Sequence, residues 1–466
     1  MSSVQLAAVI LAAGQGKRMK SKLPKVLHSL AGKPMIKHVL TLCQDLGAEP
    51  IVSVVGHGAE LVQKTLEPDQ VKFAMQKQQL GTGHALSCAA AQLAKFSGNL
   101  LLLCGDTPLL KLSSLRELLK HHQSSQAGIT VLTAKMPDPT GYGRIIRCSE
   151  GVTKIVEEKD ATSGEKAITE INTGIYLFKA PEVFEHLKQL GNNNAQGEYY
   201  LTDIIAAARG AGTRVEALIL DQAEEAMGIN DRIQLAEAET TMRKRINERH
   251  QSAGVTLVDP SATYIEMDVT IEADTVIYPN VHLRGQTKIG CNCIIEPGVV
   301  VTDCVIGDGV HLKPGSVLSE SLVGNDCTIG PMAHLRPGTE LSGNNKLGNF
   351  VETKKATFGK RSQASHLTYI GDSSVGENVN IGCGTITCNY DGVNKYRTTI
   401  EDDVFVGSDT QFIAPVTIGR GSLIAAGSTI TKDVPADALA IARTEQKNIE
   451  GWAARNRLKK AKKKEQ

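Results

Sequence analysis

The stretch IGDGVHLKPGSVLSESLVGNDCTIGPMAHLRPG, residues 306–338, repeats an aliphatic side chain every six positions. The same spacing extends from Ile289 to about Ile430, and a small or acidic residue usually follows the aliphatic one. A period of six matches neither the helical repeat of about 3.6 residues nor the two-residue alternation of a strand. The repeat therefore indicates a supersecondary unit that stacks on copies of itself, and a parallel β-helix is the favoured interpretation.

Each hexad of such a β-helix supplies one short strand and one turn, with its aliphatic side chain pointing inward. We expect Gly309, Asn325 and Gly421 at the corners, because glycine and asparagine tolerate left-handed backbone angles. Three hexads would close one triangular coil. The repeats resemble those of hexapeptide-repeat proteins, and this resemblance implies a left-handed parallel β-helix, since spacing carries no handedness. Binding and catalytic residues are then expected where the repeat is interrupted.

Length and charge bound the possible function. The chain has 466 residues, more than one core usually serves, so two domains are expected. A formal net charge of +1 gives no overall attraction to nucleic acid or to a membrane. The basic run at residues 455–464 is interpreted as a solvated tail, because no aromatic residues are interleaved for base stacking as a nucleic-acid arm would require.

The cysteines and the N-terminal segment indicate a cytoplasmic protein. The 10 cysteines follow no zinc-binding spacing, and reduced thiols explain them best. The apolar stretch Val4 to Ala13 is too short to span a bilayer and no basic segment precedes it, so it is expected to form a buried strand. No membrane insertion is expected.

The first half of the chain, from Val4 to about Leu220, alternates apolar strands with helical segments. Helices are expected at residues 34–46, 82–93 and 113–122. Strands are expected at residues 9–13, 51–55, 71–75, 99–105, 128–134 and 172–178. This alternation predicts a Rossmann-like, doubly wound α/β domain, whose ligands bind beyond the carboxyl ends of the strands.

The loop after the first predicted strand reads LAAGQGKRM, residues 11–19, and Lys25 follows six residues later. Its glycines would let backbone N–H groups approach a phosphate, and Lys17, Arg18 and Lys25 would supply positive charge. The pattern lacks the third glycine of a dinucleotide fingerprint and is not a P-loop. A plain glycine turn is therefore the alternative when this loop is considered alone.

Further loops place polar groups at neighbouring strand ends. Gln76 follows one strand, Gly81 and Thr82 open a helix, and Asp106 follows a run of leucines. Mg²⁺ prefers one or two carboxylates together with substrate phosphates, so Asp106 is a candidate ligand. The alternative is an aspartate that caps the turn before Thr107.

These motifs together resemble those of the sugar nucleotidyltransferases. They resemble closely the bacterial bifunctional N-acetylglucosamine-1-phosphate uridyltransferases/glucosamine-1-phosphate N-acetyltransferases. The matching segments are LAAGQGKRM (11–19), LPKVLH (23–28), Gln76, Gly81-Thr82, Gly105-Asp106, GYGR (141–144), IVEEKD (155–160), EINTG (170–174), QGEYYLTD (196–203) and GIN (228–230). The resemblance covers nearly the whole chain.

The resemblance implies roles for residues of the first half. Gln76 and Gly81 would read the uracil, with Leu11, Gly14 and Thr82 as further substrate-binding residues; Gly143, Glu157 and Asn172 would hold the amino sugar and the ribose; Asp106 and Asn230 would bind Mg²⁺; Arg18 and Lys25 would steady the triphosphate and the departing pyrophosphate. Lys17 departs from the family, which usually has a small hydroxylated residue there. The expected reaction is in-line attack of a sugar 1-phosphate on the α-phosphorus of UTP.

The segment between Asn230 and Gly254 is rich in helix formers and ends at a glycine, which predicts a linker helix. The expected domains are a nucleotidyltransferase domain at residues 1–229, the linker helix at 230–254, and a β-helix acetyltransferase domain with a basic tail at 255–466. Hexads begin loosely at Val258 and clearly at Ile289.

Three interruptions of the hexads are candidate binding positions. Arg336 stands where a small residue is usual, and Glu352 and Lys354 are two residues apart, so they share one side of a strand. His366 precedes a long loop at residues 388–397, and long loops on regular scaffolds usually serve binding. The alternatives are an exposed arginine, ordinary charged surface and a structural histidine.

The resemblance also implies the acetyltransferase site. His366 would be the general base that takes a proton from the amine of glucosamine 1-phosphate, a task that suits a pKa near neutrality. Arg336, Lys354, Tyr369, Asn380, Asn389 and Tyr390 would hold the phospho-sugar, and Cys383, Ser408, Ala426 and Arg443 would line the acetyl-CoA cleft. Cys383 stands where the family commonly has alanine. The groove is expected between subunits of a homotrimer.

The leading hypothesis is a cytoplasmic bifunctional enzyme that makes UDP-N-acetylglucosamine for peptidoglycan and lipopolysaccharide synthesis. It would use UTP, glucosamine 1-phosphate, N-acetylglucosamine 1-phosphate and acetyl-CoA, with Mg²⁺ as cofactor. A nucleotidyltransferase whose β-helix only trimerises or binds an effector is one alternative, and His366 together with Asn389, Tyr390 and Arg443 argues against it. A scaffold with decayed sites is the other, and the intact residues Arg18, Lys25, Asp106 and Asn230 argue against that one.

Overall fold

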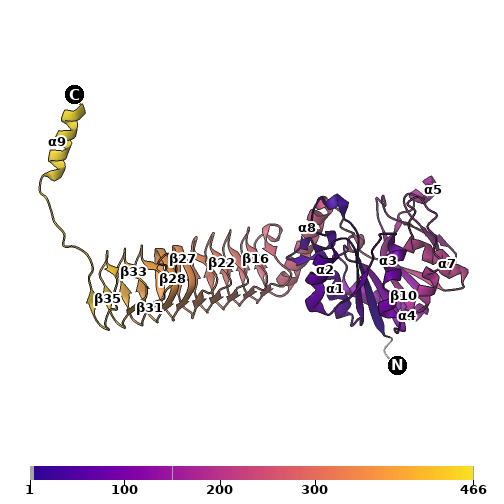
Figure 1. Cartoon of the computed structure of the whole chain (residues 1–466), viewed down its shortest axis with the longest axis horizontal. Helices are drawn as coiled ribbons and strands as arrows, with labels where there is room; N and C mark the ends of the chain where they lie inside the picture. Colours follow the sequence, from indigo (N-terminus) through magenta and orange to yellow (C-terminus); the bar gives the residue numbers. More distant parts are fainter. Residues whose placement is uncertain (1–4, 150, 465–466) are drawn as a thin grey trace. The chain divides into compact units, whose positions relative to one another are not determined.

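The computed structural model describes residues 5–149 and 151–464 of the chain. The chain divides into two compact units, Met1–Arg245 and Ile246–Gln466, drawn in Figure 1. Helix α8 (Arg232–Ser252) runs across this division, in the segment where a linker helix is expected. Each unit has its own fold.

The first unit is built on a sheet whose described residues form nine strands. The strands are β1 (Leu6–Ala12), β4 (Ile51–Val55), β5 (Lys72–Met75), β6 (Gly98–Cys104), β7 (Ile129–Lys135), β8 (Arg144–Cys148), β9 (Gly151–Val156), β10 (Glu170–Ala180) and β11 (Val215–Ile219); β2 (Ser29–Leu30) and β3 (Lys33–Pro34) form a separate ribbon. The main order is β11-β7-β10-β6-β1-β4-β5. Only β10 in this order runs antiparallel to its neighbours, so β1, β5, β6 and β11 end at one edge.

Helices cover both faces of this sheet. Helices α1 (Met35–Asp45), α2 (Ala59–Leu66) and α4 (Leu112–Ser125) contribute to one buried cluster. Helices α3 (Thr82–Cys88), α6 (Glu182–Leu187) and α7 (Ile204–Gly210) contribute to the other, and α5 (Ser163–Lys166) is a short additional helix. Strand β1 serves both clusters, since Ala8 and Ile10 belong to the first and Val9 to the second. The doubly wound prediction is confirmed.

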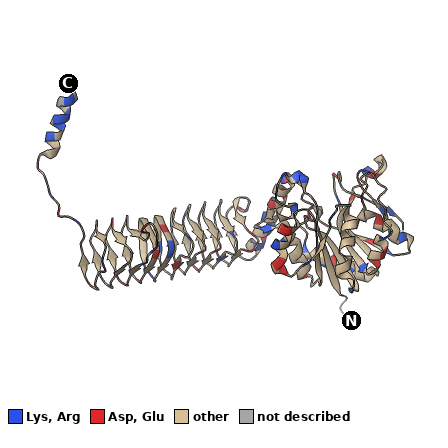
Figure 2. Ribbon diagram, viewed as in Figure 1, with Lys and Arg blue, Asp and Glu red and all other residues tan. Residues whose placement is uncertain are grey.

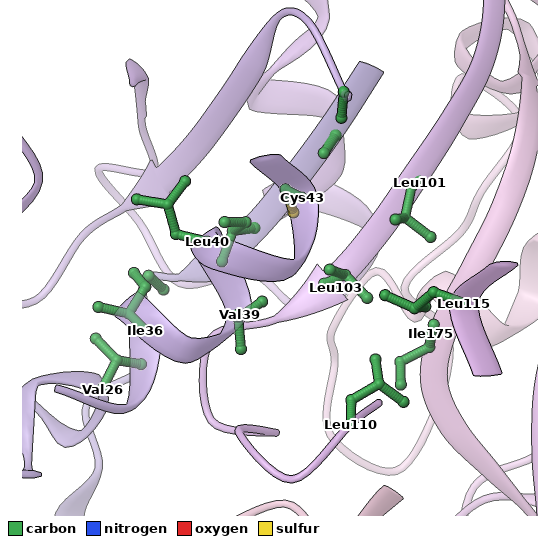
Figure 3. Packing of buried hydrophobic residues seen from close by; sticks show 14 of the residues in the cluster. Val26, Ile36, Val39, Leu40, Cys43, Leu101, Leu103, Leu110, Leu115 and Ile175 are labelled. Atoms are coloured by element: carbon green, nitrogen blue, oxygen red, sulfur yellow. The ribbon is translucent and has the colours of Figure 1, made fainter. Parts of the chain in front are cut away.

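Packing on the first face joins helix α1 to strand β6. Figure 3 shows Val39 of α1 near Leu103 of β6, and Leu40 and Leu101 belong to the same buried cluster. All four side chains are at most 2% exposed. This apolar contact holds α1 against the strand that carries Asp106 at its end, and full burial of each aliphatic side chain contributes about 1.5–3 kcal/mol.

The second unit is a parallel β-helix, as the hexads predict, and it is left-handed, as the resemblance implies. Its strands are β12 (Thr256–Leu257), β13 (Tyr264–Ile265), β14 (Thr270–Ile271), β15 (Val276–Ile277), β16 (His282–Arg284), β17 (Lys288–Ile289), β18 (Ile294–Ile295), β19 (Val300–Thr302), β20 (Val305–Ile306), β21 (His311–Leu312), β22 (Val317–Ser319), β23 (Leu322–Val323), β24 (Thr328–Ile329), β25 (His334–Leu335), β26 (Glu340–Leu341), β27 (Lys346–Phe358), β28 (Gln363–Val375), β29 (Asn380–Ile381), β30 (Ile386–Cys388), β31 (Thr398–Ile400), β32 (Phe405–Val406), β33 (Gln411–Ile413), β34 (Val416–Ile418), β35 (Leu423–Ile424), β36 (Thr429–Ile430) and β37 (Leu439–Ala440).

Strands of the regular coils pair in parallel with the third strand further along the chain. Ile271 lies beside Ile289, and Ile289 lies beside Ile306, so one coil takes three hexads or one residue less. Strands β27 and β28 are longer, with 13 residues each, and lie side by side where the hexad spacing slips. The coils appear in Figure 1 as a regular stack.

Left-handed residues turn the coils at their corners. Gly309 and Gly421 have φ angles of 66° each, as expected, but the prediction for Asn325 is wrong. The left-handed residue there is the next one, Asp326, with φ 56°. Asn325 instead accepts a hydrogen bond through Oδ1 from the Asp308 N–H at 3.0 Å, and this bond joins two coils.

Near the C-terminus, α9 (Trp452–Lys464) occupies the predicted basic tail. Figure 2 shows its lysines and arginines in blue. The described side chains of this helix are exposed except for the half-buried Asn456. Among the residues that the structure describes, none of the helices combines the length and the apolar character that crossing a bilayer requires.

Candidate functional site

A cavity of about 260 Å³ lies at the edge of the first unit's sheet where β1, β5 and β6 end. Its lining includes Leu11, Gly14, Lys25, Gln76, Gly81, Thr82 and Asp106, all predicted from the sequence. A larger cavity of about 640 Å³ lies at the opposite edge, beside Leu6 and Lys72, and the described residues that line it include none of the predicted ones. Chemistry, rather than size, identifies the smaller cavity as the candidate site.

Gln76 and Gly81 form one wall of this cavity. The buried Gln76 donates from Nε2 to the Gly81 carbonyl at 3.1 Å. Gly81 has φ 106°, and a Cβ there would lie 2.6 Å from the Tyr199 carbonyl oxygen, so only glycine fits. Thr82 accepts at Oγ1 from the Leu201 N–H at 3.2 Å, which ties the start of α3 to the segment after Tyr199. The side-chain amide of Gln76 is therefore held in one orientation, in which it could bind the edge of a heterocyclic base.

Lys25, Asp106 and Asn230 form a compact polar cluster. Lys25 Nζ donates to Asp106 Oδ2, and its distance to Asn230 Oδ1 is 3.0 Å. Asn230 is oriented by two further bonds, from its Nδ2 to the Gly228 carbonyl at 3.0 Å and from its N–H to Gln234 Oε1 at 2.8 Å. Oxygen atoms of Asp106 and Asn230, which stand in separate loops, thus both contact the Lys25 ammonium group.

This donor set fits Mg²⁺. A carboxylate and an amide oxygen are hard ligands, and Mg²⁺ takes its remaining ligands from water and substrate phosphates. Within the described ranges, no group of three or more His, Cys, Asp or Glu side chains is arranged to hold a metal. Asp106 and Asn230 would therefore hold the ion together with substrate, instead of forming a closed protein cage.

Gly143, Glu157 and Asn172 lie close to one another in the first unit, although they do not line this cavity. The Asn172 N–H donates to the Gly143 carbonyl at 2.8 Å. A Cβ on Gly143 would lie 3.1 Å from Ile155 and 3.5 Å from Glu157 Oε2, so glycine leaves space beside these two side chains. Glu157 accepts a hydrogen bond from the Thr202 hydroxyl at 3.0 Å. Burial raises the pKa of Glu157, and this hydrogen bond opposes the rise.

Arg18 is placed differently from the other predicted residues. It is exposed in the short 3₁₀ turn Lys17–Met19 and does not line the cavity. Its charge still reaches the site: burial and Asp106 raise the pKa of Tyr142, whereas Arg18 lowers it. Arg18 can therefore act on a substrate that extends beyond the cavity.

The second unit gathers cations at the Arg336 position. Arg336 Nη1 lies 2.7 Å from Glu352 Oε1 on the next coil. Lys395 and then Arg336 lower the pKa of Lys354, so both of these cations repel its positive charge. Lys395 stands in the loop that interrupts the hexads, and sequence reasoning gave it no role. A phosphate would relieve this repulsion.

His366 lies on β28 opposite Asn349 of β27, and its Nδ1 is 2.7 Å from Asn349 Oδ1. Since an amide oxygen only accepts, Nδ1 carries the proton in the neutral ring and Nε2 is left as an acceptor. The residues that follow, Phe350 and Leu367, have φ angles of 58° and 44°. Such bulky residues in left-handed backbone store about 1–2 kcal/mol each, as functional corners often do.

The other predicted phospho-sugar residues surround the same two long strands. Tyr369 pairs with Glu352, and Asn380 accepts at Oδ1 from Gln363 Nε2 at 2.9 Å. Asn389 donates to the Asp372 carboxylate, and the hydroxyl of Tyr390 donates to the Gly392 carbonyl at 2.5 Å. The loop at residues 388–397 therefore begins with anchored polar side chains.

Cys383, Ser408 and Ala426 occupy corresponding corners of successive coils. The Asp409 N–H donates to the Cys383 carbonyl at 2.7 Å, and the Gly427 N–H donates to the Ser408 carbonyl at 2.8 Å. Arg443 Nη1 donates to the Ala426 carbonyl at 2.7 Å. Three backbone corners and one guanidinium thus form a continuous edge that could hold an extended cosubstrate.

The doubly wound sheet with its polar cavity and the β-helix of hexapeptide repeats together indicate a two-domain transferase. Residues 8–207 match the MobA-like NTP transferase domain, residues 261–381 the GMPPB C-terminal domain, and residues 397–432 the bacterial transferase hexapeptide repeats.

Full-length relatives specify the family. The chain is 62% identical to the bifunctional protein GlmU of Syntrophotalea carbinolica, with 98% of both chains covered. It is 56% identical to that of Geotalea uraniireducens, covering 96% of this chain and 98% of the relative, and 54% identical to that of Geobacter sulfurreducens, covering 97% and 99%. The chain belongs to the family of bifunctional GlmU proteins.

Proposed function

We propose that the chain makes UDP-N-acetylglucosamine by two successive transfers. The second unit transfers the acetyl group of acetyl-CoA to the amine of glucosamine 1-phosphate. The first unit then transfers the uridylyl group of UTP to N-acetylglucosamine 1-phosphate and releases pyrophosphate. We assign uridylyl transfer to residues 1–229, a linking role to 230–254, and acetyl transfer to 255–466.

In uridylyl transfer the protein mainly positions charge. Gln76 and Gly81 would hold the uracil, and Glu157 and Asn172 the sugar hydroxyls. Lys25 and Arg18 would neutralise the phosphates. Phosphoryl transfer is catalysed mainly by positioning the reactants and by stabilising their charge. Asp106 and Asn230 would hold Mg²⁺, which would supply positive charge to the substrate phosphates when it is bound.

In acetyl transfer His366 would act as the base. Arg336, Lys354 and Lys395 would bind the phosphate of glucosamine 1-phosphate, and Nε2 of His366 would take the proton from its amine as the amine attacks the thioester carbonyl. The resulting thiolate of CoA leaves and takes up a proton. Cys383, Ser408, Ala426 and Arg443 would bind acetyl-CoA, with Cys383 contributing its backbone.

The proposed assembly is a homotrimer in the cytoplasm, with each acetyltransferase groove between two subunits. A parallel β-helix presents long flat faces, and closed symmetric association of such faces is the common outcome. The product would feed peptidoglycan and lipopolysaccharide synthesis.

The observation that carries the proposal is that each unit has its own polar site, Lys25–Asp106–Asn230 in the first and His366–Asn349 in the second. Two assays on one preparation test it: thiol release from acetyl-CoA with glucosamine 1-phosphate, and pyrophosphate release from UTP with N-acetylglucosamine 1-phosphate. Asp106→Ala should abolish only the second reaction. Uridylyl transfer without acetyl transfer in the unmodified chain would contradict the proposal.

A further inference from the structure

Lys25 occupies an unusual position in the first unit. Its ammonium group contacts Asp106 Oδ2 and lies 3.0 Å from Asn230 Oδ1, the same two oxygens that would hold a divalent cation. Among the described residues, Lys25 is the only cation that bonds either oxygen. The Lys25 side chain is 15% exposed and that of Asp106 is 19% exposed, so the contact is largely shielded from water.

A divalent ion and an ammonium compete for these two oxygens, because both carry positive charge. Their mutual repulsion at contact distance, about 4 Å, is strong even at an effective dielectric constant of about 20. A metal that binds Asp106 and Asn230 must therefore displace Lys25. The displaced ammonium needs a new anionic partner, and the phosphates of the substrate are the nearest chemical candidates.

We propose that Lys25 is an internal, displaceable counterion that competes with the metal for these two oxygens and so weakens metal binding until a nucleotide triphosphate arrives. This inference rests on the proposed metal-binding role of Asp106 and Asn230. The triphosphate takes Lys25, which frees both oxygens, and the metal then enters with substrate phosphates as additional ligands. Lys25 thereby acts as a positioning residue that couples metal binding to nucleotide binding in addition to neutralising phosphate.

Metal binding without substrate tests the proposal directly. Mn²⁺ is titrated into the full-length protein without nucleotide, and the free ion is followed by electron paramagnetic resonance. Lys25→Met should bind Mn²⁺ at least about tenfold more tightly than the unmodified protein, because the ion no longer competes with an ammonium. Lys25→Arg, which keeps the charge, should bind it as weakly as the unmodified protein.

Arg18→Met is the matched control, since it removes a positive charge from the same region without touching either oxygen. If Arg18→Met and Lys25→Met tighten Mn²⁺ binding equally, general electrostatics is sufficient and the proposal is overturned. Equal Mn²⁺ affinity of Lys25→Met and the unmodified protein overturns it as well.

A second measurement follows Lys25 itself. Reductive methylation with mass spectrometry reports the reactivity of each lysine, and Mn²⁺ alone should increase labelling of Lys25 but not of the exposed Lys22. Unchanged Lys25 labelling at saturating Mn²⁺ overturns the proposal that the metal displaces Lys25. The metal assignment is checked separately: if Asp106→Ala binds Mn²⁺ as the unmodified protein does in the presence of UTP, the assignment itself fails.

Discussion

Glu157 is a residue at which stability and binding oppose each other. Burial raises its pKa above 4.5, so the folded state favours the protonated form. Its contribution to stability is therefore greatest below pH 4.5, falls as the pH rises through the raised pKa, and stays low at neutral pH. We expect Glu157→Gln to raise the melting temperature of the first unit at pH 7 by about 2–4 °C. The same change should raise the KM of uridylyl transfer.

Glu158, the next residue, provides a control for which the expected change in melting temperature has the opposite sign. A hydrogen bond from Arg144 lowers the pKa of Glu158, and the two side chains are 2.7 Å apart. Arg144 is 1% exposed, so Glu158→Gln would leave a buried guanidinium without its counterion and should lower the melting temperature. Calorimetry at pH 7 checks both variants. A fall in melting temperature for Glu157→Gln would contradict the assigned cost of burying its charge.

The His366–Asn349 pair makes a second prediction at the residue scale. His366→Ala should reduce acetyl transfer by about 10²–10⁴-fold and leave uridylyl transfer unchanged, as removal of a general base requires. Asn349→Asp keeps the acceptor and adds a negative charge, which stabilises the imidazolium ion. The pH–rate profile of acetyl transfer in Asn349→Asp should therefore shift to higher pH. An unshifted profile would show that Asn349 does not orient the catalytic base.

At the scale of elements, the close approach of β27 and β28 makes the third prediction. A Cβ on Gly348 would lie 1.9 Å from the carbonyl oxygen of Ser365, the residue before His366. Gly348→Ala should therefore push the two strands apart, lower the melting temperature of the second unit and reduce acetyl transfer, while uridylyl transfer is kept. Gly210→Ala is the control, because a Cβ there meets nothing within 4 Å. Wild-type acetyl transfer in Gly348→Ala would contradict this role.

Sequence periodicity predicted some elements better than others. The hexads and the buried strand β6 carry strong apolar signals, and both were predicted correctly. The β8–β9 hairpin was missed, because its strands are only half apolar and lie at the margin of the sheet. The first coil was also weakly predicted: Leu257 is the inward residue at 6% exposure, whereas Val258 is 53% exposed, and a single hexad cannot establish register.

The partners within the sites were harder to predict than the site residues themselves. Gln76, Asp106 and Lys25 follow from the rule that loops at the carboxyl edge of a parallel sheet converge. Asn349 could not be paired with His366 from sequence, because their contact depends on the circumference of one coil, which shortens by a residue along the β-helix. Lys395 was equally hidden, since a loop conformation brings it to Lys354.

At the scale of the whole molecule, each of the two units contains a buried histidine that is sensitive to acid. Burial lowers the pKa of His122 in the first unit and of His250 in the second to about 4, from 6.5. Because the unfolded chain binds the proton more readily, the stability that each histidine contributes is present above pH 6.5 and is lost as the pH falls toward 4. Each loss amounts to at most about 3 kcal/mol.

This division predicts that acid inactivates the two activities through different residues. His122→Gln removes the titrating group from the first unit, so uridylyl transfer should survive incubation at pH 5 better than in the unmodified protein, with acetyl transfer unaffected. His250→Gln should protect acetyl transfer instead. Both activities are assayed at pH 7.5 after timed incubation at pH 5. Protection of both activities by either single substitution would show that the two units unfold together in acid, and the buried histidines would then act on one cooperative structure.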